Sequence, residues 1–411
     1  MPLNFNEKLD NYAKLAVNVG LNLNRGQRLA IRAPITAAPL VRKIAARAYD
    51  AGSPYVQVHW RDEQLDRLRY QHAPPDSFSE VPFGRRQADL ETIDSGGAIL
   101  SIVGDDPDLL QDQDPTAVAT ARAAVQKDMK PVTESIMSHR ANWSVIAAAS
   151  GPWAAKVFPE DDRHTALDRL WEAIFSSVRA DAGDPLEAWD EQVRLLSTRR
   201  DYLNDKSYRA LHLTAPGTDL SVGLPEQHTW MAAESGTSRG ITFVANLPTE
   251  EVFTLPHKDR VDGTVRSSKP LSYSGQLIDG FELTFEGGRV TRAAAETGQV
   301  ALERLLETDE GASRLGEIAL VAESSPIARS GLLYYNTLFD ENAASHIALG
   351  RAYRFCLEGG GEMSDAEACR AGANDSLAHV DFMIGSRQMD VDGITASGER
   401  EAVMRAGEWV V

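Results

Sequence analysis

The sequence predicts an α/β domain with a mostly parallel, doubly wound sheet, followed by an α+β domain. Before about residue 200, apolar runs typical of buried strands alternate with amphipathic helical segments, which indicates successive βα units. After that point, short alternating runs typical of strands predominate. The chain has 411 residues, which is more than one hydrophobic core usually serves. We therefore expect two domains, residues 1–200 and residues 201–411.

The first domain is expected to begin with a helix and then to alternate strands with helices. Residues 6–22 repeat apolar side chains at helical spacing. Strands are expected at 28–32, 55–60, 98–103 and 143–149, and helices at 36–51, 115–127 and 160–200. Gly52 ends the second helix, and Gly183, Asp184 and Pro185 interrupt the last one.

In the second domain, short strands come first and mixed elements follow. Strands are expected at 210–214, 220–222, 241–245, 271–273, 281–285 and 290–293. Gly287 and Gly288 lie between the last two strands and predict a tight hairpin. The remaining elements are expected, in chain order, to be a helix over 297–308, a strand over 317–321, a helix over 340–355 and a strand over 379–385.

Composition and charge exclude several classes of protein. Hydrophobic residues make up 43% and charged residues 25% of the chain, as in ordinary globular proteins. No apolar run reaches the ~20 residues that a membrane helix needs, and the amphipathic N-terminus lacks the features of a signal peptide. The net charge of −18, without a basic block, argues against nucleic acid and anionic membrane as partners. Cys356 and Cys369 are too few for a disulfide framework and favour a reducing cytoplasm.

Residues 337–385 concentrate side chains that bind metals. Only nine histidines occur in the chain, and the last two, His346 and His379, lie here beside carboxylates. His379 and Asp381 are two apart in an alternating run, so a strand would place both side chains on one face. Imidazole nitrogen and carboxylate oxygen are the usual ligands of Zn, Mn and Co. The alternative is a structural pair that only hydrogen-bonds internally.

His346 and Tyr353 are seven residues apart in a segment that we expect to be helical. Two helical turns would then carry both side chains on one face. Gly350 lies between them, so this face is not a continuous aliphatic stripe of the kind that packs in a core. We therefore favour a functional role for His346 over a structural one.

Several carboxylates are candidates for the same site. Glu251, beside Glu250, lies at a strand end after a turn, and Glu317 opens a buried apolar strand. Either position could instead be solvated. Asp340 is expected to cap the helix that follows it, while Glu341 either favours the dipole of that helix or serves as a base or ligand.

Other features are given simpler roles. Cys356 is expected to pack rather than to act as a nucleophile, and the loop 257–260 to be solvated. The chain contains no GxGxxG, GxxxxGKS/T or HExxH motif. The nucleotide-binding and zinc-helix chemistries that those motifs carry therefore have no support here.

Five segments stand in order along the second half of the chain. They are NLPTEEVFTLP, SGQLIDGFELTFEGGRV, LGEIALV, FDENAASHIALGRAY and HVDFMIG. Together they resemble the aminopeptidase T/aminopeptidase S family of metallopeptidases, and the resemblance extends more diffusely over the first half. It implies a homodimer whose subunits each use two co-catalytic metal ions to remove N-terminal residues from peptides.

Carried over residue by residue, the resemblance implies a ligand set and a catalytic tyrosine. The implied ligands are Glu251, Glu317, His346, His379 and Asp381, and the implied catalytic residue is Tyr353. Three carboxylates nearly neutralise two divalent ions, which we expect to be zinc, cobalt, or magnesium or manganese. The metal site therefore falls in the second domain.

At such a site, we expect hydrolysis of a peptide bond. The ions would lower the pKa of a bridging water and polarise the scissile carbonyl. Tyr353 would donate a hydrogen bond to the oxyanion, and Glu317 or Glu341 would pass the proton of the water to the leaving amine. The free amino group of the peptide would bind an ion or a nearby acid, which restricts cleavage to the first residue.

Two alternatives remain beside a cytoplasmic aminopeptidase. One is a metal-dependent amidase or other hydrolase that acts on small amides with the same ions. The other is a non-catalytic metal- or peptide-binding protein of the same fold. The full ligand set together with Tyr353 disfavours the second alternative, because simple binding needs no oxyanion donor.

Overall fold

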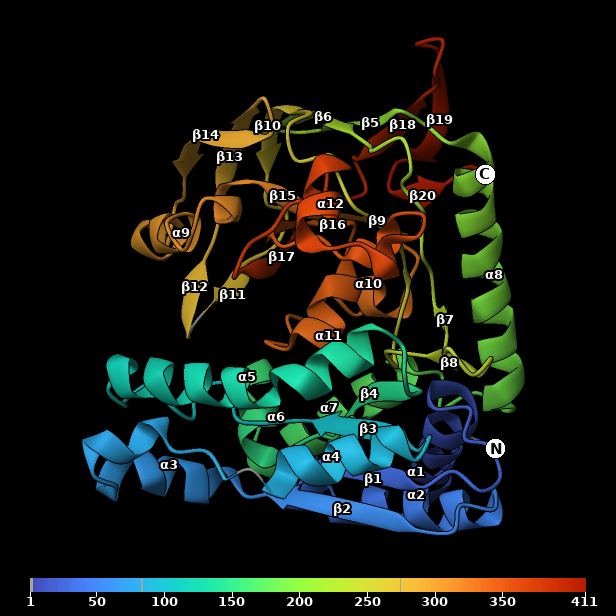
Figure 1. The fold of residues 1–411 in the computed structure, drawn as a ribbon, viewed down its shortest axis with the longest axis vertical. Coiled ribbons are helices and arrows are strands. Elements are labelled where there is room, and N and C mark those ends of the chain that lie inside the picture. Colours follow the sequence, from blue (N-terminus) through green and yellow to red (C-terminus); the bar gives the residue numbers. More distant parts are fainter. Residues whose placement is uncertain (1–2, 83, 274) are drawn as a thin grey trace. The chain divides into compact units, whose positions relative to one another are not determined.

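The computed structural model describes residues 3–82, 84–273 and 275–411. The chain folds into two compact units. The first comprises the chain up to Gln192 together with Glu234–Pro248, and the second comprises Val193–Ala233 together with Thr249–Val411. Strands alternate with helices in the first unit, whereas the second is built mainly from antiparallel strands (Figure 1). The predicted fold class is confirmed.

A four-stranded parallel sheet forms the centre of the first unit. Its strands are β1 (Leu29–Pro34), β2 (Val56–Arg61), β3 (Ala98–Val103) and β4 (Trp143–Ala147), in the order β2-β1-β3-β4. Leu29 of β1 lies opposite Val56 of β2 and Ala98 of β3. The central strands β1 and β3 are mostly buried, as expected where helices cover both faces of a parallel sheet.

The helices of this unit follow the strands in the expected alternation. They are α1 (Phe5–Leu15), α2 (Ala38–Asp50), α3 (Glu63–His72), α4 (Gly84–Asp94), α5 (Pro115–Met137), α6 (Gly151–Val157), α7 (Arg163–Ser177) and α8 (Pro185–Lys206). A capping box begins α1, because Asn4 and Glu7 each accept the backbone N–H of the other. The chain passes into the second unit along α8.

The segment Glu234–Pro248 belongs to the first unit although it follows α8. Its hairpin consists of β7 (Glu234–Gly236) and β8 (Thr242–Val244). The N–H of Val145 donates to the carbonyl of Ala245 (2.8 Å), and the N–H of Leu247 donates to the carbonyl of Val145 (3.0 Å). These bonds continue the sheet beyond β4. The domain boundary near residue 200 stays a prediction.

An eight-stranded antiparallel sheet occupies much of the second unit, in the order β14-β13-β10-β6-β5-β18-β19-β20. Its strands are β5 (Ala210–Ala215), β6 (Thr218–Gly223), β10 (Val261–Arg266), β13 (Glu282–Glu286), β14 (Arg289–Ala294), β18 (Asp390–Ile394), β19 (Arg400–Arg405) and β20 (Glu408–Trp409). The predicted hairpin joins β13 to β14 at Gly287 and Gly288, whose φ angles of 55° and 79° suit glycine. A separate hairpin pairs β11 (Leu271–Tyr273) with β12 (Gln276–Ile278).

A second antiparallel sheet, ordered β17-β16-β15-β9, carries the candidate site. Its strands are β9 (Glu251–Thr254), β15 (Leu315–Val321), β16 (His346–Gly350) and β17 (His379–Met383). Every residue of β15 and β16 is buried, which is typical of strands covered on both faces. The helices of this unit after α8 are α9 (Gln299–Leu306), α10 (Pro326–Ser330), α11 (Thr337–Asp340) and α12 (Asp365–Arg370).

The expected helix over 340–355 is wrong. The helix α11 ends at Asp340, a 3₁₀ turn follows, and His346 begins strand β16. Tyr353 lies after that strand and before another 3₁₀ turn, so it does not share a helix face with His346. A short apolar run suits a buried helix and a buried strand equally, and here the pairing with β15 and β17 decides.

The expected capping role of Asp340 is also wrong. Asn336 caps α11, where its side chain accepts the N–H of Leu338 at 3.2 Å. Asp340 instead accepts the N–H groups of Tyr334 (2.7 Å) and Asn336 (2.9 Å). Burial raises the pKa of Asp340 to about 6. This carboxyl group therefore closes the loop that precedes α11.

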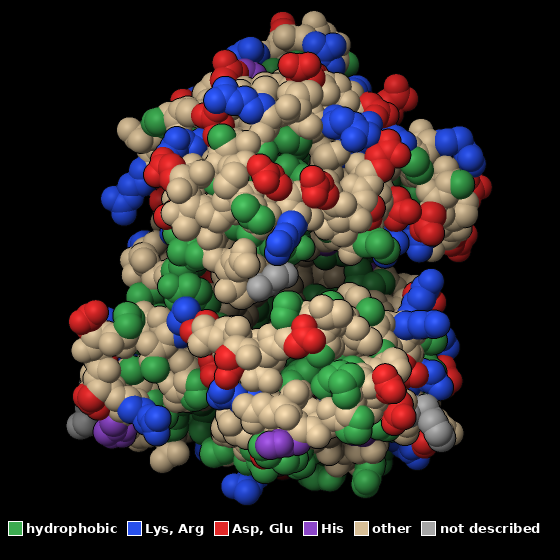
Figure 2. Space-filling model, turned by 90° about the vertical axis from the view of Figure 1, so that its left-hand side faces the viewer, with side chains coloured by type: hydrophobic (Ala, Val, Ile, Leu, Met, Phe, Trp, Pro, Cys, Tyr) green, Lys and Arg blue, Asp and Glu red, His purple; other side chains and the backbone are tan. Residues whose placement is uncertain are grey.

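Charged side chains of both signs are interspersed on the face that Figure 2 displays. Lysine and arginine lie among aspartate and glutamate there, rather than in one continuous basic area. In the described part of the chain, no helix is both long enough and apolar enough to cross a membrane.

Gly350, at the end of β16, provides a test of this strand arrangement. Its φ is +107°, and an added Cβ would lie 2.1 Å from the carbonyl oxygen of Ala378. We predict that Gly350→Ala lowers the free energy of unfolding by more than the ~1–3 kcal/mol that unfavourable backbone angles cost alone, because a clash is added. Gly331→Ala is the control, since its φ is +64° with no atom within 4 Å. Equal decreases in the free energy of unfolding of the two variants, measured by urea denaturation, would contradict the prediction.

Candidate metal centre

The pairing of β15, β16 and β17 places three of the predicted ligands on one face. Residues paired across strands share a face, and side chains alternate along each strand. Glu317 is paired with Ala348, and Ala348 is paired with Asp381. His379 lies two residues before Asp381 on the same strand, so it projects in the same direction, as predicted.

The other two predicted ligands reach the same face through β15. His346 is paired with Ala319, and Glu251 is paired with Val321. Ala319 and Val321 lie two and four residues after Glu317, and these even spacings keep all three positions on one face. The sheet register therefore aims all five predicted ligands in one direction.

The ligand atoms form two groups of three that share Glu317. One group is Glu251, Glu317 and His346, and the other is Glu317, His379 and Asp381. Within each group, one ligand atom of every residue lies within 4.8 Å of the others. Oε1 of Glu317 lies 3.6 Å from Nε2 of His346, and Oε2 lies 3.5 Å from Nε2 of His379. One carboxylate thus faces two imidazoles.

Backbone carbonyls orient both imidazoles. Nδ1 of His346 lies 3.2 Å from the carbonyl oxygen of Ala344, and Nδ1 of His379 lies 2.7 Å from that of Arg351. Because a carbonyl oxygen only accepts, Nδ1 carries the proton in each neutral ring, and Nε2 keeps its lone pair toward the carboxylates. Metal-binding histidines are commonly held in this way.

Burial and mutual repulsion act on the acids of this face. Burial, with the charges of Asp381 and Glu251, raises the pKa of Glu317 to about 7. Burial, followed by repulsion from Glu251 and Asp381, also raises the pKa of Glu341 well above its usual value. Burial would raise the pKa of Asp381 as well, but contact with His379 lowers it. The four carboxylates together leave an excess of negative charge that cations would offset.

The two imidazoles respond in the opposite sense. Burial alone would lower the pKa of His346, but contacts with Glu251 and Glu317 raise it well above its usual value. Burial would also lower the pKa of His379, but Asp381 and Glu317 raise it to about 9. Metal binding would replace the protons that these rings otherwise hold.

Two buried oxygens show that a metal fits this site. With both imidazoles neutral, Oε2 of Glu251 and Oδ1 of Asp381 accept no hydrogen bond from the described residues. They face imidazole Nε2 atoms at 3.2 Å and 3.5 Å. A buried carboxylate oxygen without a donor is costly, and a coordinated cation would satisfy it. The mixture of carboxylate oxygen and imidazole nitrogen suits zinc and related divalent ions.

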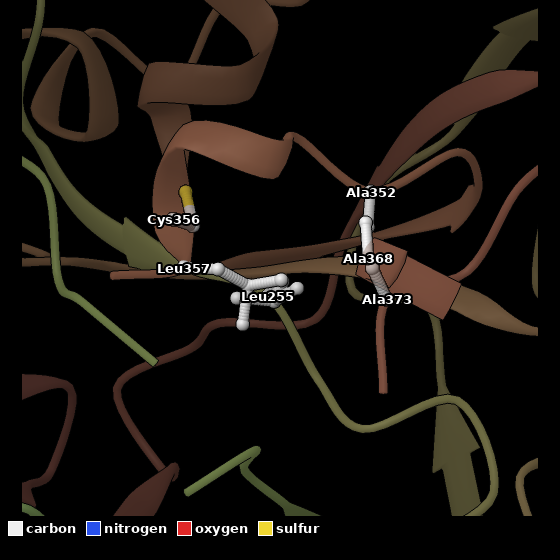
Figure 3. Packing of buried hydrophobic residues seen from close by; sticks show 6 residues of the cluster. All are labelled: Leu255, Ala352, Cys356, Leu357, Ala368 and Ala373. Atoms are coloured by element: carbon white, nitrogen blue, oxygen red, sulfur yellow. The ribbon is translucent and has the colours of Figure 1, made fainter. Parts of the chain in front are cut away.

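Tyr353 lies beside His379, with the two ring centroids 4.7 Å apart. Its ring stacks on Phe355 at 5.2 Å. Tyr353 also packs against an apolar cluster. The cluster consists of Leu255, Ala352, Cys356, Leu357, Ala368 and Ala373 (Figure 3). Burial, followed by the negative charge of Glu317, raises the pKa of Tyr353 well above its usual value. The phenol therefore stays protonated and able to donate a hydrogen bond.

Glu341 lies in the 3₁₀ turn between α11 and β16. It belongs to neither group of three, yet it is close enough to repel Glu251 and Asp381. The structure thus brings Glu341 close to the predicted ligands, outside the two groups of three. A proton-accepting role is compatible with this placement.

Asn342 is a site residue that no sequence pattern marks. It is fully buried, and its Oδ1 accepts the N–H of Glu250 at 2.7 Å. Its Nδ2 donates to the carbonyl of Leu338 at 3.1 Å. Asn342 thereby fastens the turn that carries Glu341 to the strand that carries Glu251. An asparagine beside two acids gives no signal of such a long-range contact.

Glu250 is buried beside Glu251 but belongs to neither group of three. Its charge acts instead on Arg199. Burial lowers the pKa of Arg199, and the charge of Glu250 offsets part of that decrease. Glu251 is the first residue of strand β9, whereas Glu250 precedes that strand.

Comparison with known proteins decides the family. The sequence matches the thermophilic metalloprotease (M29) family over residues 5–409. The chain belongs to this family. It is 48% identical to Aminopeptidase 2 of Geobacillus stearothermophilus over 98% of each chain, and 46% identical to Aminopeptidase AmpS of Bacillus subtilis over 98% of this chain and 99% of the relative. The structure of wild-type AmpT from Thermus thermophilus matches with a TM-score of 0.94 at 43% identity, covering 99% of this chain and 100% of that one.

The protein is therefore an enzyme that hydrolyses peptide bonds, and the resemblance seen in its sequence is confirmed. A metalloprotease family implies a divalent metal, and the two groups that share Glu317 are the candidate binding residues. The roles of the individual side chains stay predictions.

Exchanging either of two adjacent acids tests the ligand assignment. We predict that Glu251→Gln lowers the amount of bound metal and reduces activity by about 100-fold or more. Replacing a residue that only hydrogen-bonds to a metal ligand already lowers metal affinity or activity by ~10–100-fold, and loss of a ligand itself should cost more. Glu250→Gln should retain its metal, because Glu250 lies outside both groups. Metal content is measured by plasma mass spectrometry, with circular dichroism to compare folding. Metal loss from Glu250→Gln alone would reverse the assignment.

Proposed function

We propose that this M29 protein is an aminopeptidase that removes the first residue from peptides with a free N-terminus. The observation that carries the proposal is the common face of the sheet β17-β16-β15-β9, where two ligand groups meet at Glu317 with Tyr353 alongside. Similar full-length proteins named as aminopeptidases support the same conclusion.

The two ligand groups support a site for two divalent ions. Glu251 and His346 would hold one ion, His379 and Asp381 would hold the other, and Glu317 would contact both. The oxygen and nitrogen donors suit zinc or cobalt, and the excess of carboxylates would also accept manganese or magnesium. When bound, such a pair of ions acidifies a water molecule and polarises the scissile carbonyl.

The protein side chains then divide the remaining work. Glu317 faces both imidazoles, so Glu341 is left to accept the proton of the attacking water and pass it to the leaving amine. Tyr353 keeps its phenolic proton and donates a hydrogen bond to the oxyanion. Asn342 positions the turn of Glu341 through its bond to the backbone before β9.

The excess of carboxylates also supports selection of the peptide terminus. A free α-amino group is largely positive near neutral pH, and an acid that is not engaged by an ion would attract it. An acetylated terminus has no such charge. Electrostatic attraction therefore favours peptides that place their first peptide bond at the site.

The proposal includes a homodimer in the cytoplasm. The resemblance to the family supports the dimer, and two free cysteines support a reducing compartment.

Aminoacyl arylamides with and without an N-acetyl group test this function. We predict that the substrate with a free amino group is hydrolysed at least ~10-fold faster than the acetylated one. The acetylated substrate lacks the positive charge, and loss of a charge interaction of about 1.4 kcal/mol in the transition state lowers a rate tenfold. As a control, a chelator should abolish the activity and added zinc or cobalt should restore it. Equal cleavage of both forms would indicate the metal-dependent amidase instead.

Removing one hydroxyl group separates catalysis from metal binding. We predict that Tyr353→Phe lowers kcat by about 10²–10³-fold, because an oxyanion donor is lost. KM and bound metal should change little, since the ring still stacks on Phe355 and the ligand set is intact. His346→Ala should lower both metal content and activity. An unaltered kcat in Tyr353→Phe, or loss of its metal, would show that the tyrosine has another role.

A further inference from the structure

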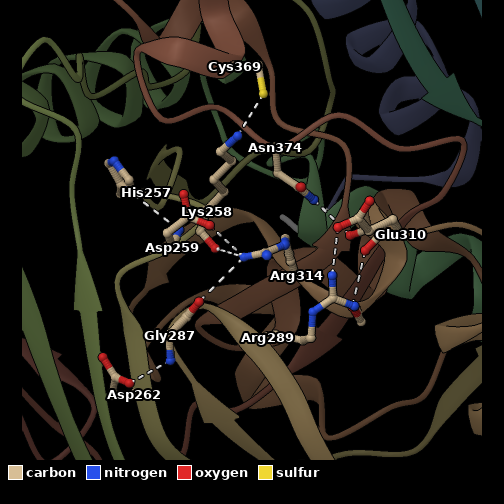
Figure 4. Close-up of polar contacts among 12 residues, drawn as sticks. His257, Lys258, Asp259, Asp262, Gly287, Arg289, Glu310, Arg314, Cys369 and Asn374 are labelled. Carbon is tan, nitrogen blue, oxygen red and sulfur yellow. Dashed lines mark hydrogen bonds and ion pairs between the residues drawn. The ribbon is translucent and has the colours of Figure 1, made fainter.

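The two cysteines of the chain have contrasting surroundings. Cys356 is buried in the apolar cluster (Figure 3), and burial, followed by the charges of Glu317 and Glu251, raises its pKa well above the usual value. It therefore stays a poorly reactive thiol. Cys369 is half-buried at the end of α12, and its Sγ lies 2.7 Å from Nζ of Lys258 (Figure 4). Only Cys369 thus combines access from solvent with an adjacent amine.

The separation of Nζ and Sγ is informative because it brings an amine and a thiol into direct contact. Hydrogen bonds from N–H to oxygen span about 2.7–3.2 Å between heavy atoms. Sulfur is larger than oxygen, so the corresponding distance to sulfur is longer. The N–H···S hydrogen bond of 2.7 Å is therefore a short one. The separation is still much too long for a nitrogen–sulfur bond. One oxygen atom bonded to both would span it.

Backbone contacts hold the pair in this position (Figure 4). The N–H of Lys258 donates to the carbonyl of Gly372 at 2.8 Å, three residues beyond Cys369. The carbonyl of Lys258 accepts Nη1 of Arg314 at 2.8 Å, and the same Nη1 lies 2.8 Å from Oδ1 of Asp259. The approach of Nζ to Sγ is therefore set by both flanking segments and not only by a long side chain.

These contacts refine the expectation of a solvated loop at 257–260. Asp259 and Arg260 are exposed, but His257 and Lys258 are half-buried. The ring of His257 lies against Gly372, where an added Cβ would come within 2.5 Å of its Cδ2. The first half of this loop is thus packed on the segment that follows α12.

We propose that Lys258 and Cys369 form a reversible N–O–S crosslink when the protein meets a peroxide. First, the Cys369 thiol gives up its proton and its sulfur attacks one peroxide oxygen. The O–O bond breaks, the leaving hydroxide takes that proton, and a sulfenic acid and one water form. A second peroxide then oxidises the sulfenic acid and the neutral Lys258 amine together. An N–O bond forms, one N–H and one O–H bond break, and two waters leave. In sum, one thiol, one amine and two peroxides give one bridge and three waters.

The crosslink would tie together two segments that contribute to the apolar cluster. Leu255 precedes Lys258, and Ala368 precedes Cys369, and both are cluster residues. The bridged residues are 111 positions apart, so the bridge closes a long loop and restricts the unfolded chain. The modification does not depend on the proposed peptidase activity.

Peptide mapping tests the proposal directly. The full-length protein is treated with hydrogen peroxide, denatured, alkylated, and digested with a protease that cleaves after glutamate. We expect one crosslinked pair of peptides that contain Lys258 and Cys369. Its mass should exceed the sum of the two peptides by one oxygen atom less two hydrogen atoms. Dithiothreitol should return both unmodified peptides.

Three variants serve as controls. Lys258→Arg keeps the positive charge but removes the amine, and Cys369→Ser removes the sulfur, so neither should form the crosslinked pair. Cys356→Ser should form it as the wild-type protein does. Melting temperatures under reducing conditions show that each variant is folded. Peroxide should then raise the melting temperature of the wild-type protein and of Cys356→Ser only.

Several results would overturn the proposal. A crosslinked pair that lacks two hydrogen atoms without the added oxygen would indicate a direct nitrogen–sulfur bond. Oxidation of Cys369 to sulfenic or higher acids, with Lys258 unmodified, would show that the amine does not react. A crosslink that persists in Lys258→Arg would place the partner of Cys369 elsewhere. An unchanged melting temperature in crosslinked protein would exclude the tethering effect.

Discussion

The concentration of negative charge on one face of the sheet β17-β16-β15-β9 is the constraint on which the rest of the site depends. Glu251, Glu317, Glu341 and Asp381 are removed from much of the surrounding water and repel one another. Isolated buried carboxylates are strongly unfavourable, so protons or cations must compensate them. Backbone pairing between buried strands brings them together, because each strand must satisfy its own N–H and C=O groups. The fold thereby stabilises an arrangement of charges that would not assemble by itself.

The side chains of this centre rest on two kinds of support. The five predicted ligands project from paired strands, whose register leaves little freedom. Tyr353 and Glu341, the proposed donor and acceptor of protons, lie instead in turns beside the strands. The turn of Glu341 is held by Asn342, and the ring of Tyr353 by Phe355 and the apolar cluster. Rigid strands suit metal binding, whereas turns allow the small adjustments that proton transfer requires.

The apolar cluster connects the metal centre to the Lys258–Cys369 pair. Tyr353 packs against it, and it includes Leu255 and Ala368, which shortly precede Lys258 and Cys369 in the sequence. The two cysteines illustrate how surroundings decide chemistry. Cys356, enclosed by apolar side chains near the acids, is kept as a thiol. Cys369 meets a primary amine at the edge of the same cluster, where an oxidant has access.

The sequence by itself determined much of the architecture and the membership of the site. Regular alternation identified the strand of His379 and Asp381, and paired glycines identified the hairpin between β13 and β14. These features are local, so a short stretch of residues contains all the information they need. The family resemblance supplied the ligand set, and the structure brings all five residues to one face.

Tertiary structure alone decided the remainder. The run from His346 to Gly350 has no period that separates a buried strand from a buried helix, and only its pairing with β15 and β17 makes it a strand. Asn342 and Glu250 are neighbours in space but 92 positions apart, and Lys258 and Cys369 are 111 apart. Such contacts depend on the register and packing of distant segments. No local pattern encodes them, because their energy is realised only when the whole unit has folded.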